Sequence, residues 1–296
     1  MTDDIGDPFA HLDDRVKDRA LADDASRLAL ISSDWWISYP PGDEVIARLF
    51  ELIDLPLRQR PPSVVVHAPP NYGKSAIIAR FVALFAGRVS RGEADKDGVV
   101  VIQAPPSVDE KRLYLEILTA IGASAPETTT ARLRAMVVNQ LRLRRTRLLI
   151  IDELQHALLQ RASAQQVVLN TLKYLSNELS LSIAGFGSRE SKALVYSDEH
   201  LAQRFEVIAL PAWDKKHSWV VDVVRQRIAL FPLRRPTVVD RRFMNLLLDL
   251  CNPIGGRMLA MLERCARTAI RDGSERLSAE LLEAVALKGE RLEHGL

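Results

Sequence analysis

Five short apolar runs occupy the middle of the chain, and most are separated by stretches whose apolar residues have helical spacing. The runs are Ser63–His67, Val99–Gln103, Leu148–Asp152, 181–186 and 207–210. Continuous apolar strands that alternate with helices are typical of a parallel sheet covered on both faces. The pattern therefore predicts an α/β fold with a mainly parallel five-stranded sheet.

The pattern changes at both ends of this region. After Trp213 there is no strand signal, and the spacing predicts four helices at 215–230, 241–251, 255–272 and 278–289. Residues 1–32 are acidic and poor in large apolar side chains, so we expect a partly ordered arm, by default a flexible tail and otherwise a docking segment for a partner. The expected division is an arm at 1–32, an α/β nucleotide-binding domain at 33–212 and a small helical lid at 213–296.

A loop at residues 67–75, His-Ala-Pro-Pro-Asn-Tyr-Gly-Lys-Ser, joins the first expected strand to a helix. Strand, loop ending in Gly-Lys-Ser and helix is the layout of a phosphate-binding loop, in which backbone N–H groups surround an anion. Lys74 would reach the β- and γ-phosphates of ATP, and Ser75 would ligate Mg²⁺. Ala68 replaces the usual first glycine, which leaves an ordinary strand–helix turn as the alternative. The expected nucleotide contacts are Asn71, Tyr72, Gly73, Lys74, Ser75 and Ala76.

The third expected strand ends in two carboxylates, Asp152 and Glu153. An apolar strand with acids at its carboxyl end is typical of a Walker B element, in which Asp152 would hold Mg²⁺ and Glu153 would polarise the attacking water. A strand that simply ends in exposed acids is the alternative. The 77 positions between Ser75 and Asp152 leave room for the two strands to lie side by side. Together the two motifs predict an ATP-hydrolysing site.

Three further polar positions fit such a site. Ser188 follows a Gly-Phe-Gly turn after the fourth strand and would contact the γ-phosphate or the water, with Arg189 as second candidate. Arg204 precedes the fifth strand and would act as a catalytic finger in a neighbouring subunit. Arg257 opens a helix of the lid and would fold back onto the phosphates. The alternatives are a plain glycine turn, an arginine with an acidic partner in its own chain, and a solvated arginine.

Contact with nucleic acid would have to be local, because 40 basic residues nearly balance 38 acidic ones and leave a net charge of only +2. Two basic groups are candidates for contact with the backbone of duplex DNA: Lys111 and Arg112, and the cluster Arg142, Arg144 and Arg145. Neither has the interleaved aromatic residues of single-strand binders. Solvated helix ends paired with acids elsewhere are the alternative interpretation.

The remaining features concern adenine recognition, the two cysteines and the location of the protein in the cell. Ile37 and Tyr39 precede the α/β domain and would either frame the adenine or belong to the hydrophobic core. Cys251 and Cys265 have no metal-ligand spacing and are typical of two buried thiols in a reducing compartment. No secretory signal and no run of about 18 apolar residues is present, so we expect a soluble cytoplasmic protein without a membrane partner.

Over about residues 33–270 the chain resembles the AAA+ ATPases, and more closely the transposition regulators of the TniB/TnsC type. The strings that carry the resemblance are the Trp-Trp segment at 33–40, the Gly-Lys-Ser loop with its helix at 73–81, Ile151-Asp152-Glu153-Leu154-Gln155-His156, Gly185-Phe186-Gly187-Ser188-Arg189-Glu190, Leu201-Ala202-Gln203-Arg204-Phe205-Glu206 and Leu210-Pro211-Ala212-Trp213. The last two are the most specific. The departures are Ala68 in the loop and Ser188 where a threonine is expected.

The resemblance implies a concrete activity. Such proteins bind ATP with Mg²⁺, assemble as rings or helical filaments on double-stranded DNA, recruit a transposase and contact a target-selection protein of the TniQ type. Hydrolysis of ATP then disassembles the filament. A nucleotide-gated signalling or defence switch and a replication-initiator-like loader are the alternatives. Such loaders often carry a further DNA-binding domain after the lid, whereas only seven residues follow Gly289 here.

Overall fold

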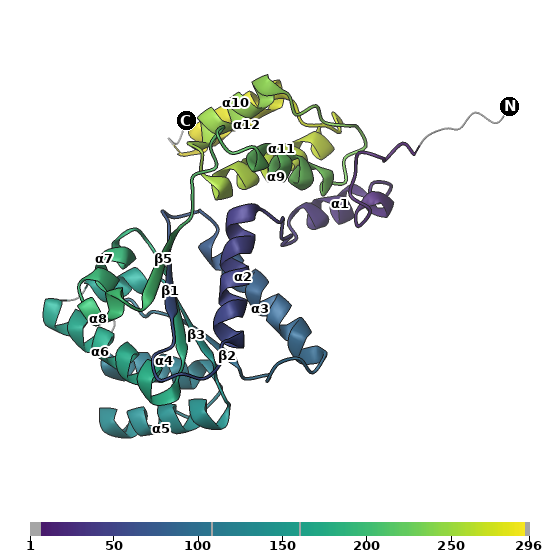
Figure 1. The fold of residues 1–296 in the computed structure, drawn as a ribbon. Helices are drawn as coiled ribbons and strands as arrows, with labels where there is room; N and C mark the ends of the chain where they lie inside the picture. The colour runs from purple at the N-terminus through teal and green to yellow at the C-terminus, as the bar shows by residue number, and fades with distance from the viewer. Residues whose placement is uncertain (1–6, 108, 160, 294–296) are drawn as a thin grey trace. The chain divides into compact units, whose positions relative to one another are not determined.

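The computed structural model describes residues 7–107, 109–159 and 161–293, and it divides the chain into two compact units (Figure 1). One is an α/β unit of residues 41–211, and the other is a helical unit formed by residues up to 40 together with 212 onward. The N-terminal segment and residues 33–40 therefore group with the C-terminal helices. The expected division had placed them in a separate arm and in the α/β domain.

The α/β unit is built on a five-stranded sheet in the order β2-β3-β4-β1-β5, and every neighbouring pair is parallel. The strands are β1 (Ser63–His67), β2 (Val99–Gln103), β3 (Leu148–Asp152), β4 (Ser182–Gly187) and β5 (Phe205–Ala209). The predicted parallel α/β sheet is confirmed. Strands β1, β3 and β4 are almost entirely buried, as expected for strands covered on both faces.

Helices cover both faces of this sheet (Figure 1). The connection from β1 to β2 crosses the sheet in one direction and the later connections cross it in the other. Because parallel crossovers are right-handed, the first connecting helix lies on the opposite face from the later ones. They are α3 (Lys74–Ser90) on one face and α4 (Glu110–Ala120), α5 (Thr130–Leu143) and α6 (Ala162–Leu179) on the other. Helix α2 (Pro40–Asp54) packs on α3, where the rings of Phe50 and Phe81 are 4.9 Å apart.

The expectation that the strand of the Asp152-Glu153 motif lies beside the loop strand is wrong, because β4 lies between β3 and β1. Two glycines of β4 make this arrangement compatible with a close approach of the two motifs. A Cβ at Gly185 would lie 2.5 Å from the side chain of Leu154, and a Cβ at Gly187 would lie 2.6 Å from Gln155 Oε1. The segment after β3 therefore packs directly against the backbone of β4.

The helical unit contains the four C-terminal helices that the sequence predicts. They are α9 (Trp219–Ala229), α10 (Arg241–Cys251), α11 (Gly255–Arg271) and α12 (Ala279–Glu293). Helix α9 begins four residues later than expected, because Asp214 accepts a hydrogen bond from the N–H of Lys216 and forms a turn there. Cys251 and Cys265 are buried and unpaired, and burial raises the pKa of the thiols to about 11 and about 12, respectively.

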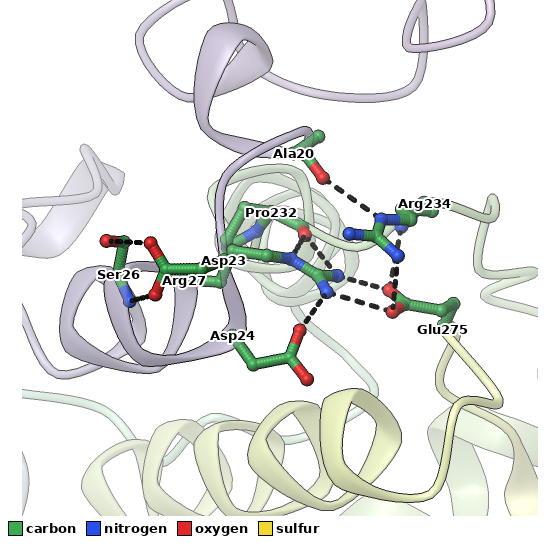
Figure 2. A network of polar contacts seen from close by, with 8 residues as sticks. All are labelled: Ala20, Asp23, Asp24, Ser26, Arg27, Pro232, Arg234 and Glu275. Atoms are coloured by element: carbon green, nitrogen blue, oxygen red, sulfur yellow. Dashed lines mark hydrogen bonds and ion pairs between the residues drawn. The ribbon is translucent and has the colours of Figure 1, made fainter.

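The N-terminal segment is a packed part of the helical unit, so the flexible tail expected for residues 1–32 is not what residues 7–31 form. Val16 and Ala20 are fully buried, and the N–H of Asp13 donates to the carbonyl of Ala229. Helix α1 (Asp24–Ile31) carries the buried Arg27, which lies in a polar network with Glu275 (Figure 2). Residues 1–6, with part of the expected acidic arm, and residues 294–296 of the expected lid lie outside the described residues.

Candidate nucleotide-binding site

The loop between β1 and α3 has the backbone of an anion-binding turn. Asn71 and Gly73 have positive φ angles of 64° and 86°, and Gly73 immediately precedes the first residue of α3. The start of this 17-residue helix contributes a partial positive charge. Ala68 is not among the residues with positive φ, and its N–H is bonded to the carbonyl of Gly187 at 3.1 Å. The backbone therefore needs no glycine at position 68.

Lys74 points back into this loop. Its Nζ donates to the carbonyl oxygens of Ala68 and Pro69 at 2.9 and 3.1 Å. Burial lowers the pKa of Lys74, while the carboxylates of Glu153 and Asp152 act in the opposite direction. A partly desolvated cation held by two neutral carbonyls can exchange them for phosphate oxygens at little cost in hydrogen bonds.

Ser75 and Asp152 form the central contact of the site. Ser75 Oγ donates to Asp152 Oδ2 at 2.8 Å, although the two residues lie on α3 and at the end of β3. A hydroxyl and a carboxylate are the hard oxygen ligands that Mg²⁺ prefers, and this ion usually takes only one or two carboxylates beside phosphates and water. The two side chains therefore fit a magnesium–nucleotide site. Tyr72 is half-buried in the same loop, and Ala76 is exposed in the first turn of α3.

Glu153 follows in a strained conformation. Its φ is 56°, and its N–H donates to Asp152 Oδ1 at 2.9 Å. A left-handed conformation of a non-glycine residue costs about 1 kcal/mol or more and is concentrated at functional sites. The carboxylate of Glu153 accepts a hydrogen bond from Gln155 Nε2.

The turn after β4 lies, like Glu153, at the carboxyl ends of the strands. The N–H of Ser188 donates to Gln155 Oε1 at 3.0 Å, while its hydroxyl donates to Glu190, which lowers the pKa of that carboxyl. Arg189 is exposed just before α7 (Glu190–Tyr196). In the sequence, Gln155 stands out only as part of the string 151–156 that resembles the TniB/TnsC type. Its position two residues after Glu153 was the available signal, but its partners could not be read from the sequence.

Arg204 lies at the opposite, amino ends of the strands. It directly precedes β5, whose first residue pairs with Ser63, whereas the nucleotide loop follows the last residue of β1. About 16 Å of strand therefore separates Arg204 from the loop of its own chain. Its guanidinium donates to Asn177 Oδ1 at 2.7 Å, so the bonding partner found for it is a neutral amide on α6 rather than the acid of the alternative interpretation. An arginine placed in this way has no access to its own site.

The other three expected nucleotide contacts belong to the helical unit. Arg257 is exposed in the first turn of α11. Ile37 and Tyr39 are buried, and the ring of Tyr39 lies 5.5 Å from each of the rings of Trp213 and Trp219. These contacts match the hydrophobic-core role that the sequence left open. Contact of all three residues with a nucleotide stays a prediction.

The two basic groups lie at opposite ends of the strands. Lys111 and Arg112 begin α4, beyond the carboxyl end of β2, whereas the cluster of three arginines precedes β3 at its amino end. Arg142 is bonded to Glu178 at 2.6 Å and Arg144 to Asp97 at 3.0 Å, while Arg145 is exposed with a φ of 53°. Lys111 is exposed, and Arg112 is bonded to the carbonyl of Ser107. The two groups therefore do not form one continuous patch on the α/β unit.

Comparison of the sequence with known protein families identifies the family of this chain. The model of the family described as "Bacterial TniB protein" matches residues 27–215, which is more than half of the chain. The chain belongs to the TniB family. No curated protein matches this TniB-family sequence.

Solved structures similar to this TniB-family chain have the α/β fold of the AAA+ ATPases. The ORC1 protein of Aeropyrum pernix, solved in complex with DNA, has a TM-score of 0.65 at 20% identity over 89% of this chain and 69% of its own. Cdc6p of Pyrobaculum aerophilum has a TM-score of 0.60 at 15% identity over 83% and 66%. The Holliday junction branch migration motor RuvB of Thermotoga maritima has 0.52 at 12% over 86% and 72%. These likenesses show the fold and confirm the predicted AAA+ core.

Among the described residues, no helix is long and apolar enough to cross a membrane.

Proposed function

We propose that this TniB-family chain is an ATP-hydrolysing, DNA-binding regulator of transposition. It would assemble on double-stranded DNA as a ring or filament, recruit a transposase and contact a TniQ-type target-selection protein, and hydrolysis would drive disassembly. The observation that carries the ATPase part is the 2.8 Å contact between Ser75 and Asp152 with Glu153 next in the chain. Membership of the TniB family supports the transposition part.

The residues divide the chemistry between them. Bound Mg²⁺ would supply positive charge that offsets the charge developing on the phosphates. Ser75 and Asp152 would hold this ion, Lys74 would bind the phosphate oxygens, and the N–H groups of the loop would orient them. Glu153 would accept a hydrogen bond from the attacking water and take up its proton. Arg204 would enter the site of a neighbouring copy, so hydrolysis would depend on assembly.

DNA binding would then follow from repetition. A net charge of +2 gives one copy little attraction to a polyanion, but an assembly repeats Lys111 and Arg112 along the duplex. The structural relative ORC1 was solved with DNA, which is consistent with this proposal.

The test is electron microscopy of negatively stained protein with duplex DNA, with ATP, with a slowly hydrolysed ATP analogue and without nucleotide. We expect nucleotide-dependent rings or filaments on DNA, which ATP hydrolysis disassembles. Glu153→Gln should bind ATP and keep the assemblies on DNA, and Glu116→Gln, a change of a half-buried glutamate on α4, is the matched control. Absence of assemblies at every salt concentration would contradict the proposal. Assemblies that persist in wild-type protein with ATP, without phosphate release, would favour a nucleotide-gated switch.

A further inference from the structure

Gln155 joins the ends of two strands through both atoms of its side-chain amide. Its Nε2 donates to the carboxylate of Glu153, which follows β3, and its Oε1 accepts the N–H of Ser188 at 3.0 Å, which follows β4. A backbone N–H only donates and an ionised carboxylate only accepts, so these two partners fix the orientation of the amide. Only one orientation of the Gln155 amide can therefore make both hydrogen bonds.

The surrounding residues make space for this bridge and hold it. A Cβ at Gly187 would lie 2.6 Å from Gln155 Oε1 and 2.1 Å from Ser191 Oγ, so a side chain at position 187 would displace the amide. The neighbouring Leu154 is buried against Gly185 of β4, where a Cβ would lie 2.5 Å from its side chain. Because Gly185 and Gly187 have no side chains, the side chains of Leu154 and Gln155 can pack against the backbone of β4.

Other side chains could not make both contacts. A glutamate at position 155 would still accept the N–H of Ser188, but it would have no proton to donate to Glu153 and would repel it. An apolar residue would leave the half-buried N–H of Ser188 without its partner, which costs about 1–3 kcal/mol. A glutamine has both the required length and the required pair of donor and acceptor.

We propose that Gln155 is a positioning residue that couples the turn after β4 to the catalytic carboxylate. With the N–H of Ser188 in place, the amide holds one oxygen of Glu153 in a fixed direction. A movement of the Ser188 turn pulls on the amide and turns Glu153 out of line for the attacking water. ATP turnover therefore depends on the position of the β4 end, while ATP binding does not. This inference rests on the proposed ATPase function.

The test compares steady-state ATP turnover with binding of a fluorescent ATP analogue for two substitutions of Gln155. Gln155→Glu keeps the size and the hydrogen bond to Ser188 but removes the donor to Glu153, and Gln155→Met removes both hydrogen bonds. We expect both to lower kcat roughly 10–100-fold, the usual effect of a misplaced catalytic group. KM and the dissociation constant of the analogue should stay within about twofold. Gln166→Ala, a change of an exposed glutamine on α6, is the control that should leave kcat unchanged.

A third variant disturbs the amide of Gln155 by a substitution on β4. Gly187→Ala removes no polar group, but its Cβ would crowd both the amide of Gln155 and the hydroxyl of Ser191, so it should lower kcat in the same way. Wild-type turnover by Gln155→Glu would overturn the inference and leave the proposed function intact. Absence of turnover in the wild-type protein would overturn the proposed ATPase itself. A parallel loss of kcat and of analogue binding would show a general disturbance of the site and would also overturn the coupling.

Discussion

Ser75 Oγ lies 2.8 Å from Asp152 Oδ2, across 77 positions of the sequence and across the width of strand β4. This contact brings the two hard oxygen groups together within the protein alone. One Mg²⁺ ion could therefore be held by both groups, although they belong to separate elements of the fold.

Removal of either oxygen should weaken the magnesium-dependent part of ATP binding. We expect Ser75→Ala and Asp152→Asn to reduce the difference between analogue binding with Mg²⁺ and with a chelator, and to lower turnover at least tenfold because the developing charge is less stabilised. Ser90→Ala, at the exposed end of the same helix, should change neither. Titrations of fluorescent ATP analogue with and without Mg²⁺ measure the difference, and an unchanged difference would remove Ser75 from the metal site.

Arg204 should act only between subunits, because about 16 Å of strand separates it from its own loop. We expect Arg204→Ala to bind nucleotide and to hydrolyse it poorly. Mixing it with Lys74→Ala, which keeps Arg204 but lacks the lysine proposed to bind phosphate, should restore part of the turnover. In mixed assemblies an intact arginine then meets an intact site. Phosphate release by the mixture is the measurement, and no recovery in mixtures that co-assemble would contradict a role between subunits.

The two basic groups should contribute unequally to DNA binding. Lys111 is exposed, whereas Arg112, Arg142 and Arg144 have the acidic partners Asp109, Glu178 and Asp97, respectively. We expect Lys111→Ala to weaken binding and to reduce the salt slope by about 1 for each phosphate that is no longer neutralised. Arg142→Ala should change either quantity much less. Fluorescence anisotropy of labelled duplex DNA across a salt series compares them, and the reverse order would move the DNA-binding surface to the amino end of β3.

Ala68 is the position where the sequence departs from the usual phosphate loop, and the backbone explains why the departure is tolerated. The positive φ angles of the loop fall at Asn71 and Gly73 instead. We therefore expect Ala68→Gly to leave ATP turnover nearly unchanged and to lower stability by about 0.4–1 kcal/mol through greater freedom of the unfolded chain. Chemical denaturation and an ATPase assay check the two parts. A large gain in turnover would show that the alanine limits the geometry of the loop.

The strands could be predicted from the sequence because each depends on a local pattern, and so could the positions of the Gly-Lys-Ser loop and of Asp152 at strand ends. The position of β4 between β1 and β3 could not, since strand order is set by contacts between distant segments. The glycines that allow this order, Gly185 and Gly187, indicated only a turn. Gln155 was hidden for the same reason, because its hydrogen bond with Ser188 spans 33 positions.

The composition of the N-terminal segment does not reveal its packing. Its acids are partly balanced within the segment, as in the 2.7 Å pair of Arg15 with Asp13. Its apolar residues are few, but Val16 and Ile31 are fully buried. A buried arginine, Arg27, looks like any surface charge in a sequence, since only its distant partner reveals its role.

The ion pair of Arg27 with Glu275 should make the stability of the helical unit depend on pH (Figure 2). Burial raises the pKa of Glu275, but hydrogen bonds from Arg27 and from the N–H of Arg234 outweigh it, so the net shift is below the usual 4.5. A carboxyl whose pKa is lower in the folded state stabilises the fold above its unfolded pKa, and this contribution is lost as the pH falls through the folded value.

We expect wild-type protein to lose stability below about pH 4.5, and Glu275→Gln to be less stable at pH 7 but less sensitive to acid over that range. Arg27→Met should cost about 3–5 kcal/mol at pH 7, because it leaves the buried carboxylate with only Arg234, whose guanidinium is 3.8 Å away, as its cation. Thermal unfolding between pH 3 and pH 7 measures all three proteins, with Glu280→Gln, a change in the exposed pair with Arg242, as the control that should change little. An acid sensitivity of Glu275→Gln equal to that of the wild type would show that other carboxylates set the pH dependence.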